Sequence, residues 1–186
     1  MLLDRVTGWI ERREQSLRAW EAQGENRARK VYWRAYVLAF LICCAVALLG
    51  YAVNGRALLW AADGFEQYYP FFIYEGDWLR SIFAGLLSGQ GLQVALWEWN
   101  IGYGSDVLLT LDVIMDPINL LSAFAPGAAS EWMYQFTIIL RLFLSGVTFS
   151  IFALNHGKGR FATLCGSLLY ALSVTNLLIC IWPGFS

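Results

Sequence analysis

The chain has 186 residues, of which 58% are hydrophobic and only 15% are charged, and its mean hydropathy is +0.51. Soluble domains usually contain about 25% charged residues, so this composition indicates a membrane protein. The formal net charge of −1 excludes a nucleic-acid-binding surface, and one histidine with four cysteines in apolar runs argues against a zinc site or a disulfide framework.

The first 34 residues are mostly polar and form a separate segment, predicted to be an amphipathic cytoplasmic helix. Its apolar positions near one face are Leu3, Val6, Ile10, Leu17 and Trp20. One interpretation is a helix that lies in the lipid headgroup layer. The other is a surface helix without a specific role, and it is favoured because Arg13 interrupts the apolar stripe.

Three apolar runs, at 35–53, 135–155 and 161–182, predict three membrane-spanning helices. A helix rises 1.5 Å per residue, so about 20 residues cross a hydrocarbon core of about 30 Å. The fold class is therefore all-α and polytopic, with a membrane domain at 35–186.

The distribution of Lys and Arg predicts the orientation of these helices. Arg27, Arg29, Lys30 and Arg34 crowd the entry to the first run, and Lys158 and Arg160 lie in the short turn between the second and third runs. Basic residues favour the cytoplasmic side, so the N-terminus and the turn at His156 are predicted to be cytoplasmic. The segment 54–134 carries nine acidic and two basic residues and is predicted to be external.

The external segment is too long to lack structure of its own. Pro70 precedes an amphipathic helix that is predicted to lie on the outer membrane surface, with apolar positions Phe71, Tyr74, Trp78, Ile82 and Leu86. Asp116 and Pro117 predict the start of a second short helix. Gly102 and Gly104 predict a tight turn between the two helices, and further acids are interpreted as solvated helix faces or caps: Glu75, Asp77, Asp112 and Glu131.

Asp63 and Glu66 follow the first span and allow two interpretations. The first is a capping box, with Asp63 as the N-cap and Glu66 at the third helical position. The second is an acidic site over the membrane surface, which is favoured because Pro70 would interrupt a capped helix after about one turn.

Four short motifs follow one another in a recognisable order: Gln-Tyr-Tyr-Pro at 67–70, Trp-x-Trp-Asn-x-Gly-x-Gly-Ser-Asp at 97–106, Asp-Pro-x-Asn-Leu-Leu at 116–121 and Gly-Ser-Leu-Leu-Tyr-Ala-Leu-Ser at 166–173. From about Tyr36 onward, this ordered set resembles the bacterial YfhO-type membrane proteins, which are related to the GT-C glycosyltransferases. Such proteins have many more spans, so the chain is expected to be an N-terminal, GT-C-like portion located in the bacterial cytoplasmic (inner) membrane.

The resemblance implies an enzyme that transfers a sugar from a polyprenyl-phosphate carrier to a cell-envelope acceptor on the outer face. Asp63 matches the acid expected at the start of the first external loop, as a base or as a ligand to a divalent cation. Glu66 and Asp106 are expected to bind substrate nearby. The alternative is a non-enzymatic protein, a transporter portion or an assembly factor, whose acidic external loop binds a partner.

Arg141 is the one charged residue within a predicted span. An arginine in hydrocarbon costs about 2.5 kcal/mol or more near the centre, so it must find a partner or reach the surface. We expect Arg141 either to bind the phosphate of the carrier lipid, or to snorkel or pair with a loop acid such as Asp112 or Asp116.

Overall fold

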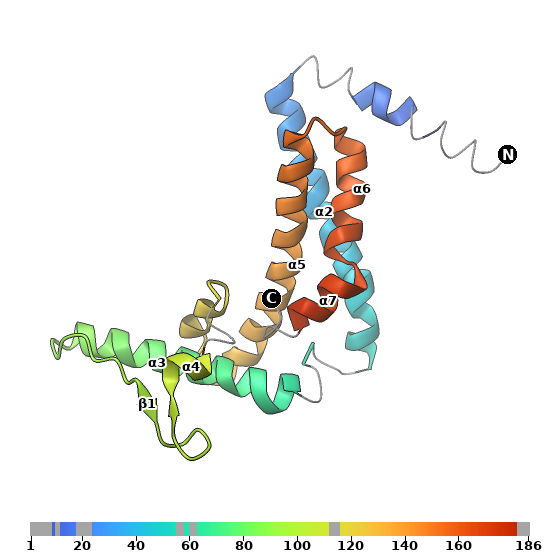
Figure 1. Ribbon diagram of the computed structural model, residues 1–186. Coiled ribbons are helices and arrows are strands. Elements are labelled where there is room, and N and C mark those ends of the chain that lie inside the picture. The colour runs from blue at the N-terminus through green and yellow to red at the C-terminus, as the bar shows by residue number, and fades with distance from the viewer. Residues whose placement is uncertain are drawn as a thin grey trace. The chain divides into compact units, whose positions relative to one another are not determined.

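The protein is mostly helical in a computed structural model that describes residues 9, 12–17, 24–54, 58–59, 63–111 and 116–181. The chain forms two compact units. Unit 1 comprises Met1–Asn54 and Leu142–Asn176, and unit 2 comprises Gly55–Arg141 and Leu177–Ser186. Helix α5 (Ala129–Asn155) contributes its first half to unit 2 and its second half to unit 1 (Figure 1).

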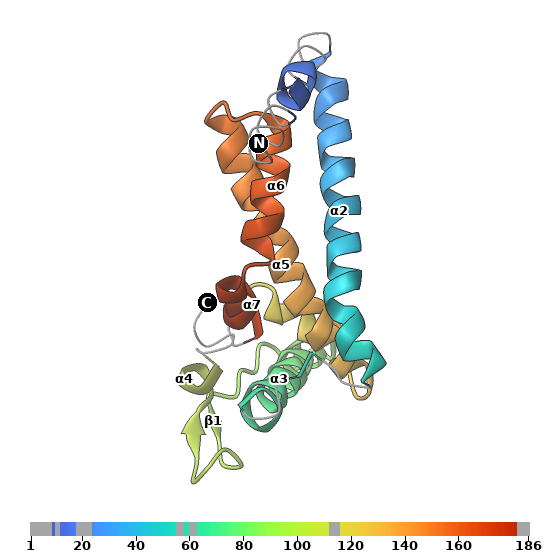
Figure 2. The ribbon, with the colours of Figure 1, turned by 90° about the vertical axis from the view of Figure 1, so that its right-hand side faces the viewer.

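Unit 1 contains α2 (Glu25–Val53), the second half of α5 and α6 (Arg160–Ala171), which lie side by side in Figures 1 and 2. Within the described residues, two helices are long and apolar enough to cross a membrane, at Arg27–Gly50 and Ala129–Asn155. Both begin upstream of the predicted spans, because the helices continue through polar residues that a search for uncharged runs omits.

Aromatic and small residues bring the helices of unit 1 together. The Tyr32 hydroxyl donates to the Ser150 hydroxyl (2.7 Å), and the Tyr36 hydroxyl donates to the Phe143 carbonyl (2.8 Å). The Tyr36 hydroxyl lies against Gly146, where a Cβ would collide with it. Helices in membranes use small residues and interhelical hydrogen bonds in this way, because apolar side chains gain little by leaving lipid.

The prediction of a third span at 161–182 is corrected, because the described residues of this run form two helices and not one. Helix α6 ends at Ala171, and α7 (Val174–Ile181) begins three residues later. The Ser173 hydroxyl accepts the N–H of Asn176 (3.2 Å), as an N-cap does, so the serine starts a new helix where the hydropathy pattern predicts continuity. A third span is therefore not confirmed.

Unit 2 is built around α3 (Tyr69–Leu87), which follows the π-helical turn η1 (Gly64–Tyr68) and packs against the 3-10 helix η2 (Asn119–Phe124). Gly76 allows this packing, because a Cβ there would lie 2.7 Å from the Ser122 carbonyl oxygen. Arg80 adds hydrogen bonds to the carbonyls of Ser122 (2.9 Å) and Ala123 (3.2 Å). Both helices predicted for the external segment are therefore present.

A short hairpin lies between these helices and adds two strands to the predicted all-α fold. Strand β1 (Trp97–Glu98) pairs antiparallel with β2 (Ser105–Asp106), which leads into α4 (Val107–Leu111). Gly102 and Gly104 have positive φ angles of 59° and 103°, which confirms the tight turn predicted there. The Trp78 indole donates to the Ala95 carbonyl (2.9 Å) and ties the approach to the hairpin to α3.

The amphipathic helix predicted for the N-terminal segment is described only at Trp9 and at residues 12–17, all of which are helical. The Trp9 ring contacts Phe161 of α6, with ring centroids 5.8 Å apart. Leu3, Val6, Ile10 and Trp20 of the predicted stripe lie outside the described residues.

The predicted orientation can be tested by labelling single cysteines in cells, after replacement of the native cysteines. A membrane-impermeant maleimide is expected to label Ser105→Cys in intact cells, because Ser105 belongs to the acidic segment, and to label His156→Cys only after lysis. If the labelling order is reversed, the topology and every proposal for outer-face chemistry are wrong.

Candidate functional site

Arg141 and Asp116 form the centre of a polar cluster in unit 2. The Arg141 side chain is 7% exposed, and its Nη2 lies 2.6 Å from Asp116 Oδ2, which also accepts the Nε–H (3.1 Å). This pair is the loop-acid partner that sequence analysis gave as one alternative for Arg141. An unpaired buried charge would be costly, so the pair accounts for the position of an arginine in an apolar helix.

Asp116 connects the ion pair to the start of η2. Its Oδ1 accepts the N–H groups of Ile118 (2.6 Å) and Asn119 (3.1 Å), while Oδ2 binds Arg141. Pro117, between Asp116 and Ile118, has no N–H and a restricted φ, and both properties suit the first position of a helical turn. The Asp-Pro motif therefore positions a carboxylate for Arg141 and caps η2 with the same side chain.

Asn119 and Thr137 complete the coordination of the guanidinium. Arg141 Nη2 donates to Asn119 Oδ1 (2.6 Å), and Nη1 donates to the Thr137 hydroxyl (3.3 Å). Asn119 is 1% exposed and Thr137 is fully buried. These bonds use four of the five N–H donors of arginine, so the orientation of the side chain is fixed.

Glu75 is a further buried acid in unit 2, and it corrects the interpretation of this residue as part of a solvated helix face. Its side chain is 1% exposed, and neither carboxylate oxygen has a hydrogen-bond partner within the described residues. The pKa of Glu75 is raised to about 8, chiefly by burial and in smaller part by the Asp116 carboxylate, against the lowering effect of Arg141. Glu75 is therefore mostly protonated at neutral pH.

The buried face of α3 differs from the face that sequence analysis predicted. Phe72, Glu75 and Gly76 are buried, whereas the predicted stripe from Phe71 to Ile82 is half-buried and Leu86 is exposed. The spacing of Phe72, Glu75 and Gly76 is itself helical, so the periodicity was present in the sequence. A search for apolar residues at helical spacing does not count a glutamate or a glycine, so it did not find the face of α3 that packs inward.

Ser122 and Tyr134 also place buried polar atoms in unit 2. Their hydroxyl oxygens have no hydrogen-bond partner within the described residues, as for the Glu75 carboxylate. Buried polar groups are nearly always satisfied, so several exceptions in one unit indicate a place for water or for a polar ligand. Titratable groups with perturbed pKa values in such a place are typical of functional sites.

The acids selected from the sequence as site residues, Asp63, Glu66 and Asp106, all belong to unit 2. Asp63 is half-buried at the start of η1, and its side chain makes no capping hydrogen bond. Glu66 is exposed. Asp106 is exposed on β2, and its Oδ1 accepts the N–H of Leu109 (3.0 Å), as a helix cap does. No described hydrogen bond or ion pair joins any of these three acids to Arg141.

The geometry of Asp63 bears on its two interpretations. A capping box requires the N-cap side chain to accept a backbone N–H, and this bond is missing. The helix also continues past Pro70, because the π-helical turn η1 leads directly into α3 and places the proline in its first turn. The Asp63 carboxylate therefore does not cap the helix.

Within the described part of the chain, no three His, Cys, Asp or Glu side chains gather in a way that could hold a metal ion. At the centre of the cluster the Asp116 carboxylate is already paired with the positive charge of Arg141, which disfavours a metal ion there. Asp63 and Glu66, near the start of η1, are the acids that could each supply a single carboxylate ligand to a cation.

Long apolar helices and a structured polar segment between them define an α-helical membrane protein. The chain belongs to the YfhO family, because the family model described as bacterial membrane protein YfhO matches residues 35–184. The match begins at the first predicted span and leaves out the polar N-terminal segment. No curated protein and no solved structure matches the chain.

Proposed function

We propose that the chain is the N-terminal part of a membrane glycosyltransferase, which transfers a sugar from a polyprenyl-phosphate carrier to a cell-envelope acceptor on the outer face. The observation that carries the proposal is the ionisable cluster of Arg141, Asp116 and Glu75 in unit 2, in which Arg141 and Glu75 are buried and Asp116 is half-buried. The resemblance of the ordered motifs to GT-C-related proteins supports the reaction class, and membership of the YfhO family supports the membrane location.

In the proposed reaction, an acceptor hydroxyl attacks the anomeric carbon of the carrier-linked sugar. The new bond joins the acceptor oxygen to that carbon, the bond from the carbon to the phosphate oxygen breaks, and polyprenyl phosphate leaves with the electron pair. Asp63 takes the hydroxyl proton as the general base. Its carboxylate suits this role because the start of η1 does not use it as a cap.

Arg141, Glu66 and Asp106 have supporting roles in this proposal. Arg141 stabilises the phosphate through the one N–H donor that its described bonds leave, and Asp116 and Asn119 hold the guanidinium in place. Glu66 and Asp106 are exposed carboxylates in unit 2 and accept hydrogen bonds from sugar or acceptor hydroxyls. A divalent cation would require Asp63 or Glu66 as its protein ligand.

Gene deletion distinguishes the proposal from a non-enzymatic role. Loss of the natural full-length protein is expected to remove a sugar substituent from a cell-envelope polymer or lipid, and to leave the carrier-linked sugar to accumulate. Mass spectrometry of the envelope fraction measures both. An envelope of unchanged composition, with no accumulated donor, would favour the partner-binding alternative.

Arg141→Lys tests the phosphate contact. Lysine keeps the charge, but it cannot bind Asp116 and Asn119 as the guanidinium does and still present the same donor to the phosphate, so affinity for a polyprenyl-phosphate sugar in the natural protein is expected to fall about tenfold. Asp116→Asn is the matched control, because it weakens the same ion pair and keeps a side-chain oxygen for the cap. If Arg141 is only structural, both variants lower thermal stability and neither changes carrier affinity.

A further inference from the structure

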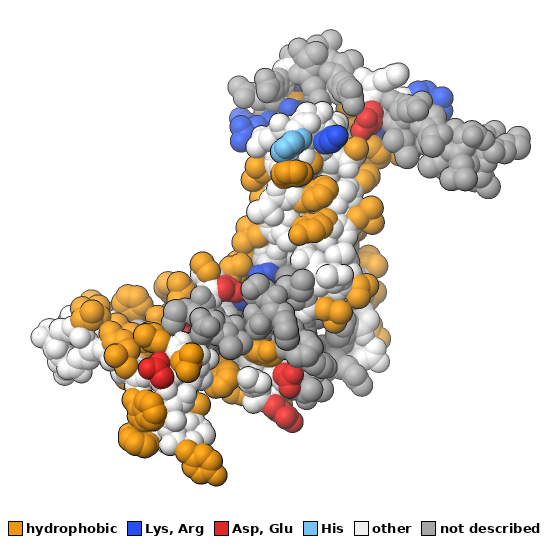
Figure 3. Space-filling model, in the orientation of Figure 1, with side chains coloured by type: hydrophobic (Ala, Val, Ile, Leu, Met, Phe, Trp, Pro, Cys, Tyr) orange, Lys and Arg blue, Asp and Glu red, His pale blue; other side chains and the backbone are white. Residues whose placement is uncertain are grey.

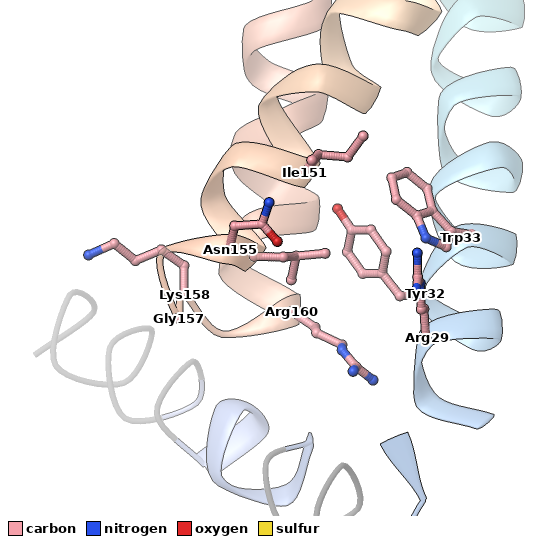
Figure 4. Close-up of a pocket in the computed structure, with 9 residues that line it drawn as sticks. Arg29, Tyr32, Trp33, Ile151, Asn155, Gly157, Lys158 and Arg160 are labelled. Atoms are coloured by element: carbon pink, nitrogen blue, oxygen red, sulfur yellow. The ribbon is translucent and has the colours of Figure 1, made fainter. Parts of the chain in front are cut away.

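Unit 1 contains a pocket of about 400 Å³ at the end where α5 meets α6. Arg29, Tyr32 and Trp33 of α2 form one wall, and the other wall is formed by Ile151, Leu154, Asn155, Gly157, Lys158 and Arg160. Figure 4 shows the two walls facing each other, with Tyr32 directed into the space between them. The volume is within the range of small-molecule sites.

The lining of this pocket is basic. Arg29, Lys158 and Arg160 contribute three positive charges, and none of the described residues that line the pocket is acidic. Figure 3 shows Lys and Arg gathered with the histidine at this end of unit 1, where α5 turns into α6. Glu14 lies beside the pocket against the first residues of α6, because a Cβ on Gly159 would meet its carboxylate at 2.7 Å.

The pocket lies at one end of both candidate membrane spans, which is the position of lipid headgroups when such helices cross a bilayer. It is lined by the first turns of the apolar span Arg27–Gly50 and by the last turn of the span Ala129–Asn155. Tyr and Trp side chains are enriched at this depth, and Tyr32 and Trp33 both line the pocket. Arginine and lysine at such a position attract the phosphates of anionic lipids.

Exposed apolar side chains follow the pocket-lining residues along both helices. Ile151 lines the pocket and is 47% exposed, and its neighbour Phe152 is also exposed. On the opposite wall, exposed Val37 and Leu38 continue α2 toward the membrane interior. A molecule with a phosphate headgroup and acyl chains matches this arrangement better than inorganic phosphate, which would use only the basic part.

From these features we infer that the pocket binds the phosphate headgroup of an anionic phospholipid. Arg29 supplies charge-assisted hydrogen bonds to the phosphate oxygens, Asn155 supplies a neutral donor, and the acyl chains lie along Ile151. Figure 4 shows the Lys158 side chain directed away from the space between the two walls, so Lys158 contributes a positive charge at the edge of the pocket. The site is in unit 1 and is independent of the glycosyltransferase proposal.

Native mass spectrometry of the full chain in detergent tests this inference, with phosphatidylglycerol and phosphatidylcholine supplied in equal amounts. The first bound lipid is expected to be phosphatidylglycerol. Arg29→Gln combined with Lys158→Gln is expected to weaken its binding about tenfold or more, because the two substitutions remove two positive charges from the lining of the pocket. Both residues are exposed, so the substitutions are compatible with folding.

Arg27→Gln combined with Lys30→Gln is the matched control. It removes the same charge from exposed positions of α2 that do not line the pocket, and it is expected to keep the affinity. Equal weakening by the two double variants would show only general attraction to a basic surface and would overturn the inference. Displacement of phosphatidylglycerol by millimolar inorganic phosphate would overturn it as well, because the site would then bind free phosphate.

Discussion

Asp63→Asn in the natural full-length protein is expected to lower sugar transfer at least about a hundredfold, while membrane insertion is unchanged. General-base catalysis contributes roughly 10²-fold to 10⁴-fold to such reactions, and an amide cannot take the proton. Asparagine has the shape of aspartate and can still cap a helix, so it removes only the chemistry. The measurement is the rate of label transfer from a carrier-linked sugar in isolated membranes.

Glu131→Gln is the control for this experiment. Glu131 is an exposed acid in the first turn of α5, and it has no place in the proposed site. Its variant is expected to transfer sugar at the wild-type rate. Asp63 is not the base if the Asn variant retains the wild-type rate, whatever the control does.

The second large effect concerns stability and pH, and it arises from Glu75. Its pKa is near 8 in the folded protein, against an ordinary value of 4.5, so the folded state binds the proton more tightly than the unfolded chain. This contribution to the free energy of unfolding is fully present below about pH 4.5. It falls as the pH rises from about 4.5 to 8, by up to about 5 kcal/mol in total, and is absent above that range.

Glu75→Gln isolates this contribution, because glutamine resembles the protonated acid and does not ionise. The thermal midpoint of the purified protein in detergent is expected to fall between pH 5.5 and pH 8.5 for the wild type, and to fall much less for the variant. Glu131→Gln should keep the wild-type slope. A variant with the full wild-type slope would show that Glu75 already carries its charge at neutral pH.

The sequence predicts the long helices of this protein well and the breaks within them poorly. The apolar runs at 35–53 and 135–155 lie within α2 and α5, because burial of about twenty apolar residues in lipid dominates local preferences. The break at Ser173 depends on one side-chain hydrogen bond. Hydropathy averaged over a span does not detect a single cap.

The candidate site was predictable in part for the same physical reason. An arginine in an apolar helix requires a partner, and Asp116 was one of two acids that the sequence offered for Arg141. The choice between them depends on the Asp-Pro turn, which places one carboxylate oxygen on η2 and the other on Arg141. Glu75 was missed because its burial depends on the approach of η2 to Gly76, a contact between residues distant in sequence.

The glycosyltransferase assignment is tested with the purified natural protein in proteoliposomes, supplied with a synthetic polyprenyl-phosphate sugar and an envelope acceptor. The labelled sugar is expected to move to the acceptor, and one polyprenyl phosphate is expected to be released for each sugar transferred. The Asp63→Asn protein, inserted to the same level, is expected to do neither. Binding of the donor without transfer by the wild-type protein, for every envelope acceptor supplied, would contradict the glycosyltransferase assignment.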